Sequence, residues 1–316
     1  MSKKNNVIFR KFYDKYQEYR SRKISKSSLL TLDTLKAKYL VDLSEKTINE
    51  IFVSKSLAKI YNLIIKRNDL SQKYKNRLIG EIRFICDFAN KMDYVSSTLI
   101  IKTKNVLENV KVTTNLKEKS FYTKDQLKSF INSIEDETDK DMFILFTYLG
   151  ARLSEFIGLT WDCYDEIEKT IKIKQQIIYL KEGKPILSNQ LKTKESYRIC
   201  KLNDECNSIL LKRKEKSSKG FIFPKSISNP NVPLPKTNFR LKLKKYIEKA
   251  NLPLVTPHSF RHAKATLLMS VCLSMADVKA AARFLGHSVT MMMETYAHED
   301  QKNTDLIFSR LDKIFL

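Results

Sequence analysis

The sequence predicts a mainly α-helical protein with a small antiparallel β-sheet, in which a helical N-terminal domain precedes an α/β domain. Apolar residues recur at helical spacing through residues 7–91, and alternating segments rich in β-branched residues occur within residues 170–202. A polar, charged stretch between the two patterns indicates a linker. We expect a first domain at 1–112, a linker at 113–122 and a second domain at 123–316, since 316 residues are enough for two cores.

The N-terminal domain is predicted to be a helical bundle with basic faces. Its expected helices cover residues 7–20, 27–41, 44–52, 55–67 and 71–91. Ser44 is expected to cap the third helix, because serine accepts hydrogen bonds from the free N–H groups of a first turn. Periodicity alone fits any helical bundle, so it assigns no function to this domain.

The second domain is predicted to mix helices and strands. Its expected helices begin near residues 123, 139, 236, 256 and 274, and its expected strands cover residues 170–180 and 187–202. Thr123 is placed to cap the first helix, and Thr256 with Pro257 fits the start of a later one. Ser274 fits the N-cap of the next helix, which is expected to end at Gly286.

The chain carries a large positive charge. It has 58 basic and 35 acidic residues, a formal net charge of +23. Residues 1–112 hold 24 of the basic and 11 of the acidic residues, so the charge is most concentrated in the first domain. This excess indicates a polyanionic partner and favours nucleic acid over a membrane; the alternative is a lysine-rich surface that is merely solvated.

Several function classes lack their sequence signals. No glycine-rich phosphate-binding loop, signal peptide or run of 18 apolar residues occurs, so we expect a cytoplasmic protein with no membrane span and no small-molecule cofactor. The scattered, odd-numbered cysteines form no CxxC pair, so we expect reduced thiols. They are Cys86, Cys163, Cys200, Cys206 and Cys272.

Two basic residues are predicted to share one face at a helix start. His258 and Arg261 lie three residues apart in "TPHSFRHAKATLL", in a first turn whose free N–H groups and dipole favour an anion. They can therefore hold a phosphate. The alternatives are a capping histidine beside a surface arginine, or a zinc site with His262, for which no third ligand is evident.

Further basic residues lie in two other segments. Arg152, in "LGARLSEFIGLTWD", offers a planar fork for two phosphate oxygens, and Glu155 is placed to orient it. Lys192, in "LKTKESYRICKL", can protonate a leaving oxygen. Lys194 competes for this role, because residues two apart in an extended segment point to the same face.

A histidine and a tyrosine lie in the segment "LGHSVTMMMETYAH". His287 follows a glycine, and Tyr296 is nine residues further on. A tyrosine with an ordinary pKa near 10 is a weak nucleophile, so it needs a base and a neutralised phosphate. The basic residues and this tyrosine together suit attack by a phenolate on a phosphodiester.

With these spacings, residues 120 to 300 resemble the tyrosine recombinases of the phage integrase superfamily. The resemblance rests on "GxRxSE", "HxxR" and "LGH" followed by a tyrosine. It implies a helical core-binding domain of the SAM-like type and an α/β catalytic domain. It also implies that Glu155 supports a catalytic set made of Arg152, Lys192, His258, Arg261, His287 and Tyr296.

The resemblance further implies a reaction. Tyr296 would attack the scissile phosphate, forming a 3′-phosphotyrosyl link and freeing a 5′-hydroxyl, with His258 handling the tyrosyl proton and Lys192 protonating the leaving oxygen. Both arginines and His287 would stabilise the transition state. Because the phosphoester energy is kept in the protein–DNA bond, neither ATP nor a metal is needed.

The implied partners are double-stranded DNA with inverted half-sites and further copies of the chain in a tetrameric synapse. Integration or excision of a mobile element is the favoured role, with Xer-type chromosome dimer resolution as the alternative. A type IB topoisomerase, a non-catalytic DNA-binding protein on the same fold and a metallohydrolase also remain open. Residues 300–316 carry one apolar stripe, expected to form a tail helix that docks on a neighbouring subunit or packs on its own domain.

Overall fold

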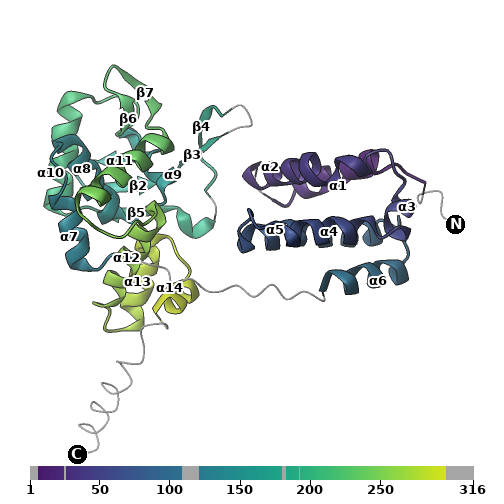
Figure 1. The fold of residues 1–316 in the computed structure, drawn as a ribbon. Coiled ribbons are helices and arrows are strands. Elements are labelled where there is room, and N and C mark those ends of the chain that lie inside the picture. Colours follow the sequence, from purple (N-terminus) through teal and green to yellow (C-terminus); the bar gives the residue numbers. More distant parts are fainter. Residues whose placement is uncertain (1–5, 25, 109–120, 180–182, 192, 297–316) are drawn as a thin grey trace, which may run out of the picture. The chain divides into compact units, whose positions relative to one another are not determined.

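The structure, a computed structural model, describes residues 6–24, 26–108, 121–179, 183–191 and 193–296. The described residues form two compact units, one before residue 109 and one after residue 120 (Figure 1). Both are mainly helical, and the second contains small antiparallel sheets, so the predicted fold class is confirmed. The linker predicted at 113–122 and the tail helix predicted after residue 300 fall almost wholly outside the described residues, and the domain boundaries therefore stay predictions.

The first unit is a helical bundle. Its elements are α1 (Phe9–Ser21), α2 (Lys26–Leu35), a π-helical turn (Lys36–Leu40), a 3-10 turn (Val41–Leu43), α3 (Ile48–Val53), α4 (Ser56–Lys66), α5 (Gln72–Lys91) and α6 (Ser97–Glu108). The prediction that Ser44 caps the third helix is wrong. Ser44 ends the 3-10 turn in a right-handed helical conformation, whereas Thr47 is extended and forms a capping box with Glu50. Helix α6 was not predicted separately.

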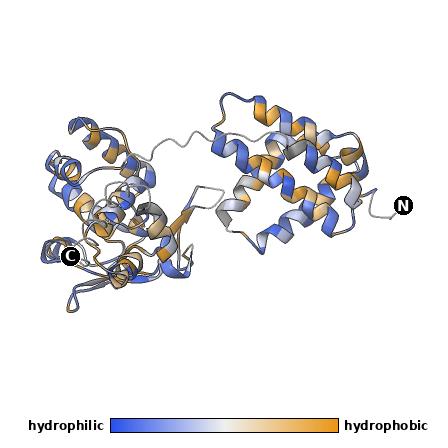
Figure 2. Cartoon of the chain, turned by 90° about the horizontal axis from the view of Figure 1, so that it is seen from below, coloured by the Kyte–Doolittle hydropathy of each residue, from blue (hydrophilic) through white to orange (hydrophobic). Residues whose placement is uncertain are grey.

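Aromatic side chains fill the core of this unit. Phe12 packs edge-on against Tyr94, with ring centroids 5.1 Å apart, and also contacts Phe88. The helices are amphipathic, as the alternation of hydrophobic and hydrophilic residues along them shows (Figure 2). Near the core, the Arg20 guanidinium pairs with the Glu81 carboxylate at 3.0 Å, and both side chains are largely buried. The bundle thus has a core of its own.

The helices of the second unit follow the capping signals of the sequence. They are α7 (Lys124–Asn132), α8 (Glu137–Leu149), α9 (Leu153–Phe156), α10 (Asp204–Lys216), α11 (Lys236–Lys249), α12 (Pro257–Met269), α13 (Met275–Leu285) and α14 (Val289–Tyr296). Thr123, Thr256 and Ser274 are N-caps, and Gly286 ends α13 with a positive φ of 67°, as predicted. Helices α10 and α14 were not predicted.

The strands depart from the prediction. They are β1 (Tyr164–Asp165), β2 (Thr170–Ile173), β3 (Gln176–Tyr179), β4 (Pro185–Ser188), β5 (Arg198–Lys201), β6 (Pro224–Ser226) and β7 (Asn229–Pro233). The expected strand 170–180 is broken at Gln175, whose buried side-chain amide donates to the Gly158 carbonyl at 2.8 Å. As a result β2 joins an antiparallel sheet in the order β1-β2-β5, whereas β3 pairs with β4 alone.

Phenylalanines from four helices pack together beside these sheets. Phe146 of α8 contacts Phe156 of α9, Phe239 of α11 and Phe260 of α12, with ring centroids 4.9–6.0 Å apart. This cluster fixes the starts of α9 and α12, which carry the two arginines of the predicted site. Among the described residues, no helix combines the length and the apolar character that crossing a membrane requires.

Candidate active site

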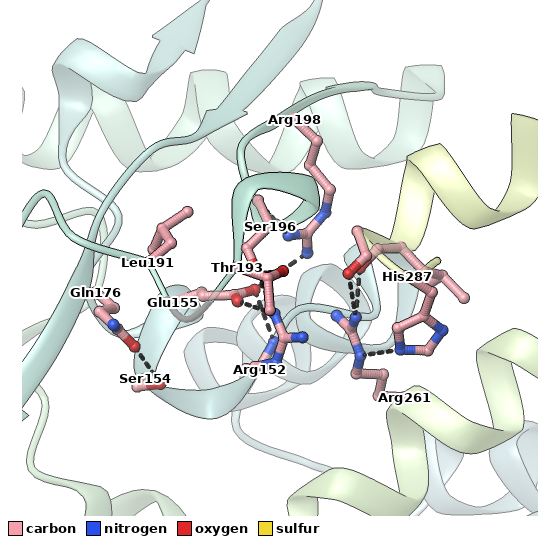
Figure 3. A network of polar contacts seen from close by, with 12 residues as sticks. Arg152, Ser154, Glu155, Gln176, Leu191, Thr193, Ser196, Arg198, Arg261 and His287 are labelled. Atoms are coloured by element: carbon pink, nitrogen blue, oxygen red, sulfur yellow. Dashed lines mark hydrogen bonds and ion pairs between the residues drawn. The ribbon is translucent and has the colours of Figure 1, made fainter. Parts of the chain in front are cut away.

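Arg152 is the residue just before α9, and Glu155 holds it from within the same turn. The Arg152 NH1 group donates to Oε1 of Glu155 at 2.6 Å, and the Arg152 backbone N–H donates to Oε2 at 3.1 Å. The Glu155 side chain is 1% exposed and that of Arg152 is 22% exposed. The carboxylate is therefore buried, whereas part of the Arg152 side chain stays exposed to solvent. Figure 3 shows the two side chains joined by hydrogen bonds.

The loop that carries the candidate lysines packs against Arg152. We call residues 189–197, between β4 and β5, the lysine loop. The buried Ser196 hydroxyl accepts from the Arg152 NH1 group at 2.9 Å. The predicted strand 187–202 is wrong here, because residues 194–196 form a 3-10 turn. Lys194 therefore does not continue the extended segment that would have placed it on the same face as residue 192.

Arg261 lies on α12 and is turned into the domain, with 1% of the residue exposed. Its NH1 group donates to the Gly150 carbonyl at 2.9 Å and its NH2 group to the Leu285 carbonyl. Burial, with the nearby charge of Arg152, lowers the pKa of the Arg261 guanidinium to about 9, which still leaves it charged at neutral pH. The site thus has a fixed positive charge below its surface.

His287 is held against Arg261 by a hydrogen bond. The Nε–H of Arg261 donates to Nε2 of His287 at 3.0 Å, and Nδ1 of His287 lies 3.4 Å from the Met292 sulfur. Burial, then the charge of Arg261, lowers the pKa of His287 to about 3. The imidazole is therefore neutral in the fold, with Nε2 as acceptor and the proton on Nδ1.

The neutral state of His287 predicts how stability depends on pH. In the unfolded chain His287 takes up a proton below about pH 6.5, whereas in the fold it stays neutral down to about pH 3. The unfolded state then binds more protons, so the free energy of unfolding should fall by about 2 kcal/mol between pH 6.5 and pH 5. His287→Gln, which keeps an acceptor for Arg261 but does not titrate, should lose less. Thermal unfolding of both proteins at the two pH values checks this; equal losses would contradict it.

The other predicted residues are either exposed or outside the described part of the structure. His258 lies exposed on the first turn of α12, with its ring centroid 4.5 Å from that of His262. Lys194 is exposed in the lysine loop, and Lys192 lies outside the described residues. Tyr296 is the last residue of α14, and its side chain is outside the description. The structure thus brings together Arg152, Glu155, Arg261 and His287.

Two residues at this site were missed by the reasoning from sequence. Arg198 of β5 is buried and donates from NH2 to Oε2 of Glu155 at 3.2 Å, and Ser196 carries the loop contact to Arg152. In a chain with 58 basic residues, nothing in the sequence separates one buried arginine from solvated ones. The only available signal was the alternation of β5, which puts Arg198 on the same inward face as Cys200.

The zinc alternative gains no support from the described side chains. Within the part of the chain that the structure describes, no group of three or more histidine, cysteine, aspartate or glutamate side chains is arranged to hold a metal ion. The pair His258 and His262 therefore has no third protein ligand among these residues.

Comparison with known proteins gives relatives over most of the chain. The integrase of ICEBs1 from Bacillus subtilis is 24% identical over 321 residues, covering 90% of this chain and 82% of that protein. The tyrosine recombinase XerD of Corynebacterium glutamicum is 28% identical over 169 residues, covering 52% of this chain and 49% of that protein.

Solved structures share the fold. The Tn1549 transposon integrase in complex with a circular intermediate DNA matches with a TM-score of 0.74 at 21% identity, covering 95% of this chain and 98% of that one. A lambda integrase tetramer bound to a Holliday junction matches with a TM-score of 0.62 at 17% identity, covering 92% and 78%. The sequence pattern of the phage integrase family matches residues 120–303, more than half of the chain. This chain therefore belongs to the phage integrase family of tyrosine-type site-specific recombinases.

Proposed function

We propose that this protein cuts and rejoins double-stranded DNA through a 3′-phosphotyrosyl intermediate, with Tyr296 as the nucleophile. The observation that carries the proposal is the cluster of three arginines, Arg152, Arg198 and Arg261, around the single carboxylate of Glu155. Such a cluster has an excess of positive charge in a place of low solvent access, which suits a phosphate that gains charge in a transition state. The nucleophile's helix, α14, packs against α12, which carries Arg261.

Each residue then has a role in the proposed reaction. Arg152 binds the scissile phosphate with the part of its side chain that stays exposed, and the buried Arg261 adds a fixed positive charge beneath it. His258 takes the tyrosyl proton, and Lys192 protonates the leaving 5′ oxygen. The Nε2 atom of His287 accepts a hydrogen bond from the Nε–H of Arg261, and its Nδ1 atom keeps a proton. The residues themselves supply charge and protons, so the reaction as proposed needs no metal or ATP.

We further infer a role in moving a genetic element. The ICEBs1 and Tn1549 integrases, which belong to mobile elements by their names, match this chain over 90% or more of its length, whereas the Xer recombinase of Corynebacterium matches about half. By analogy with the DNA complexes among the structural neighbours, the partner is duplex DNA and four protomers form a synapse. The inverted half-sites are proposed from the resemblance of the sequence to the family. The charge of +23 supports a DNA partner independently.

A trapping experiment tests this function. The purified protein is incubated in EDTA with nicked suicide substrates built from the ends of the DNA element that encodes it. We expect a protein–DNA adduct on denaturing gels, attached at the 3′ side of the break and unaffected by EDTA. An adduct that forms only with added metal, or attachment at the 5′ side, would contradict the proposal.

A further inference from the structure

Arg198 is the first residue of β5, and its side chain is buried behind the exposed part of the site. Its side chain is 1% exposed. The NH1 group donates to the Ser196 carbonyl at 2.9 Å and the NH2 group to Oε2 of Glu155 at 3.2 Å, whereas the buried Nε has no partner among the described residues (Figure 3). A phosphate on the surface cannot reach this guanidinium.

Arg198 acts on Arg152 through Glu155. Oε2 of Glu155 receives both the Arg198 NH2 group and the Arg152 backbone N–H, and Oε1 receives the Arg152 side chain. Burial raises the pKa of Glu155, but the charge of Arg198, followed by that of Arg152, outweighs it and leaves the pKa below the ordinary value. Among the neighbouring charges, that of Arg198 therefore does most to lower the pKa of this carboxyl.

Arg198 also acts on Arg152 through the lysine loop. It binds the carbonyl of Ser196, and the hydroxyl of the same serine accepts from the Arg152 NH1 group at 2.9 Å. The hydroxyl of Thr193, which precedes Lys194 and follows Lys192 in the chain, lies 3.1 Å from the Ser196 hydroxyl. One buried arginine therefore connects the loop of the proposed general acid with the arginine of the proposed phosphate site.

We propose that Arg198 is a positioning residue of the recombination reaction, which fixes Arg152 and the lysine loop in one arrangement by binding Glu155 and the Ser196 carbonyl. The inference rests on the proposed function, in which Arg152 binds the scissile phosphate. The competing explanation is that Arg198 only stabilises the domain. The two explanations predict different pH dependences of cleavage, because only the positioning role acts through the ionised Glu155 carboxylate.

Replacing Arg198 should make cleavage sensitive to acid. Without the Arg198 charge, the pKa of Glu155 is higher than in the wild type, so protonation releases its hold on Arg152 at a higher pH. The charged and titratable groups around Glu155 from the neighbouring segments are Arg152, Arg198, Cys200 and Arg261, and His287 contacts Arg261. A purely structural loss would lower the cleavage rate by the same factor at every pH.

The experiment measures single-turnover cleavage of a suicide substrate from about pH 8 to about pH 5.5, as the ratio of each variant's rate to that of the wild type. Arg198→Met should keep half-site binding and lose about 100-fold in cleavage, since small displacements of a positioned group cost on this order. The loss should deepen toward acid pH. Arg198→Lys, which keeps the charge, should recover part of the rate and show a ratio independent of pH. If Arg198→Met does not fold, Arg198→Gln replaces it with the same expectation.

Two controls separate the explanations. In the Glu155→Gln background, Arg198→Met should show no acid-dependent loss, because no carboxyl remains to titrate. Arg213→Met removes a partly buried arginine of the same unit, which binds the Ile222 carbonyl, and should lower thermal stability without changing the pH dependence of cleavage.

Several results would overturn the inference. The first is that folded Arg198→Met cleaves as fast as the wild type. The second is that its cleavage rate is lowered by the same factor at every pH, also in the Glu155→Gln background. Absence of an adduct with the wild-type protein would instead contradict the proposed function itself, so the two failures are distinguishable.

Discussion

Tyr296→Phe should bind a half-site as the wild type does and form no covalent adduct with DNA. Phenylalanine has the ring of tyrosine and lacks only its oxygen, so the expected loss of cleavage is more than about 10,000-fold, the scale on which covalent catalysis fails without its nucleophile. Half-site binding is followed by gel shift and the adduct by denaturing gel on nicked suicide substrates. Loss of binding together with the adduct would show a folding defect instead.

Two other tyrosines serve as controls for the nucleophile. Tyr197 is half exposed in the lysine loop, where its hydroxyl accepts from the Leu191 N–H, and Tyr179 ends β3 with its hydroxyl near the Lys236 N–H. Tyr197→Phe and Tyr179→Phe should both retain the adduct. An adduct that survives in Tyr296→Phe and disappears in one of these variants would move the nucleophile to that residue.

Lys192→Ala should reduce cleavage by about 1,000-fold, within the range that a positioned general acid contributes. The reason is that the departing 5′ oxygen needs a proton, which alanine cannot supply. A substrate with a 5′-bridging phosphorothiolate should restore cleavage to this variant, because a thiolate leaves without protonation. Single-turnover rates on the two substrates give the ratio directly.

Lys194→Ala is the matched control for the general acid. Lys194 is an exposed lysine of the same loop, in the 3-10 turn, so its replacement should be milder and should not be rescued by the phosphorothiolate. The reverse pattern, with rescue of Lys194→Ala alone, would place the general acid two residues further along the loop.

The sequence predicted those parts of the fold that depend on local chemistry. Helix starts at Thr123, Thr256 and Ser274 follow from side chains that bond their own first turn, and the positive φ at Gly286 follows from the freedom of glycine. The prediction that Ser44 caps the third helix was wrong because Ser44 ends a 3-10 turn, which helical periodicity does not reveal. The cap of α3 is Thr47.

What the sequence left out depends on contacts between distant segments. The break at Gln175 needs the carbonyl of Gly158, and the burial of Arg198 needs the carboxylate of Glu155, 43 residues earlier. The neutral state of His287 likewise follows from burial beside Arg261. The family motifs predicted which residues belong to the candidate site, but they carried no information on which of them face inward.

The two carbonyl partners of Arg261 have a consequence for the order in which the domain can be completed. Gly150 lies 111 residues before Arg261, and Leu285 lies 24 residues after it. When α12 has just emerged from the ribosome, the Gly150 carbonyl is already present but the Leu285 carbonyl has not been made. The Arg261 guanidinium, which is buried in the finished domain, then lacks one of its acceptors. We expect the contacts of Arg261 to remain incomplete during translation until residue 287 has left the ribosome, so the buried charge is fixed only shortly before the proposed nucleophile, Tyr296, is made.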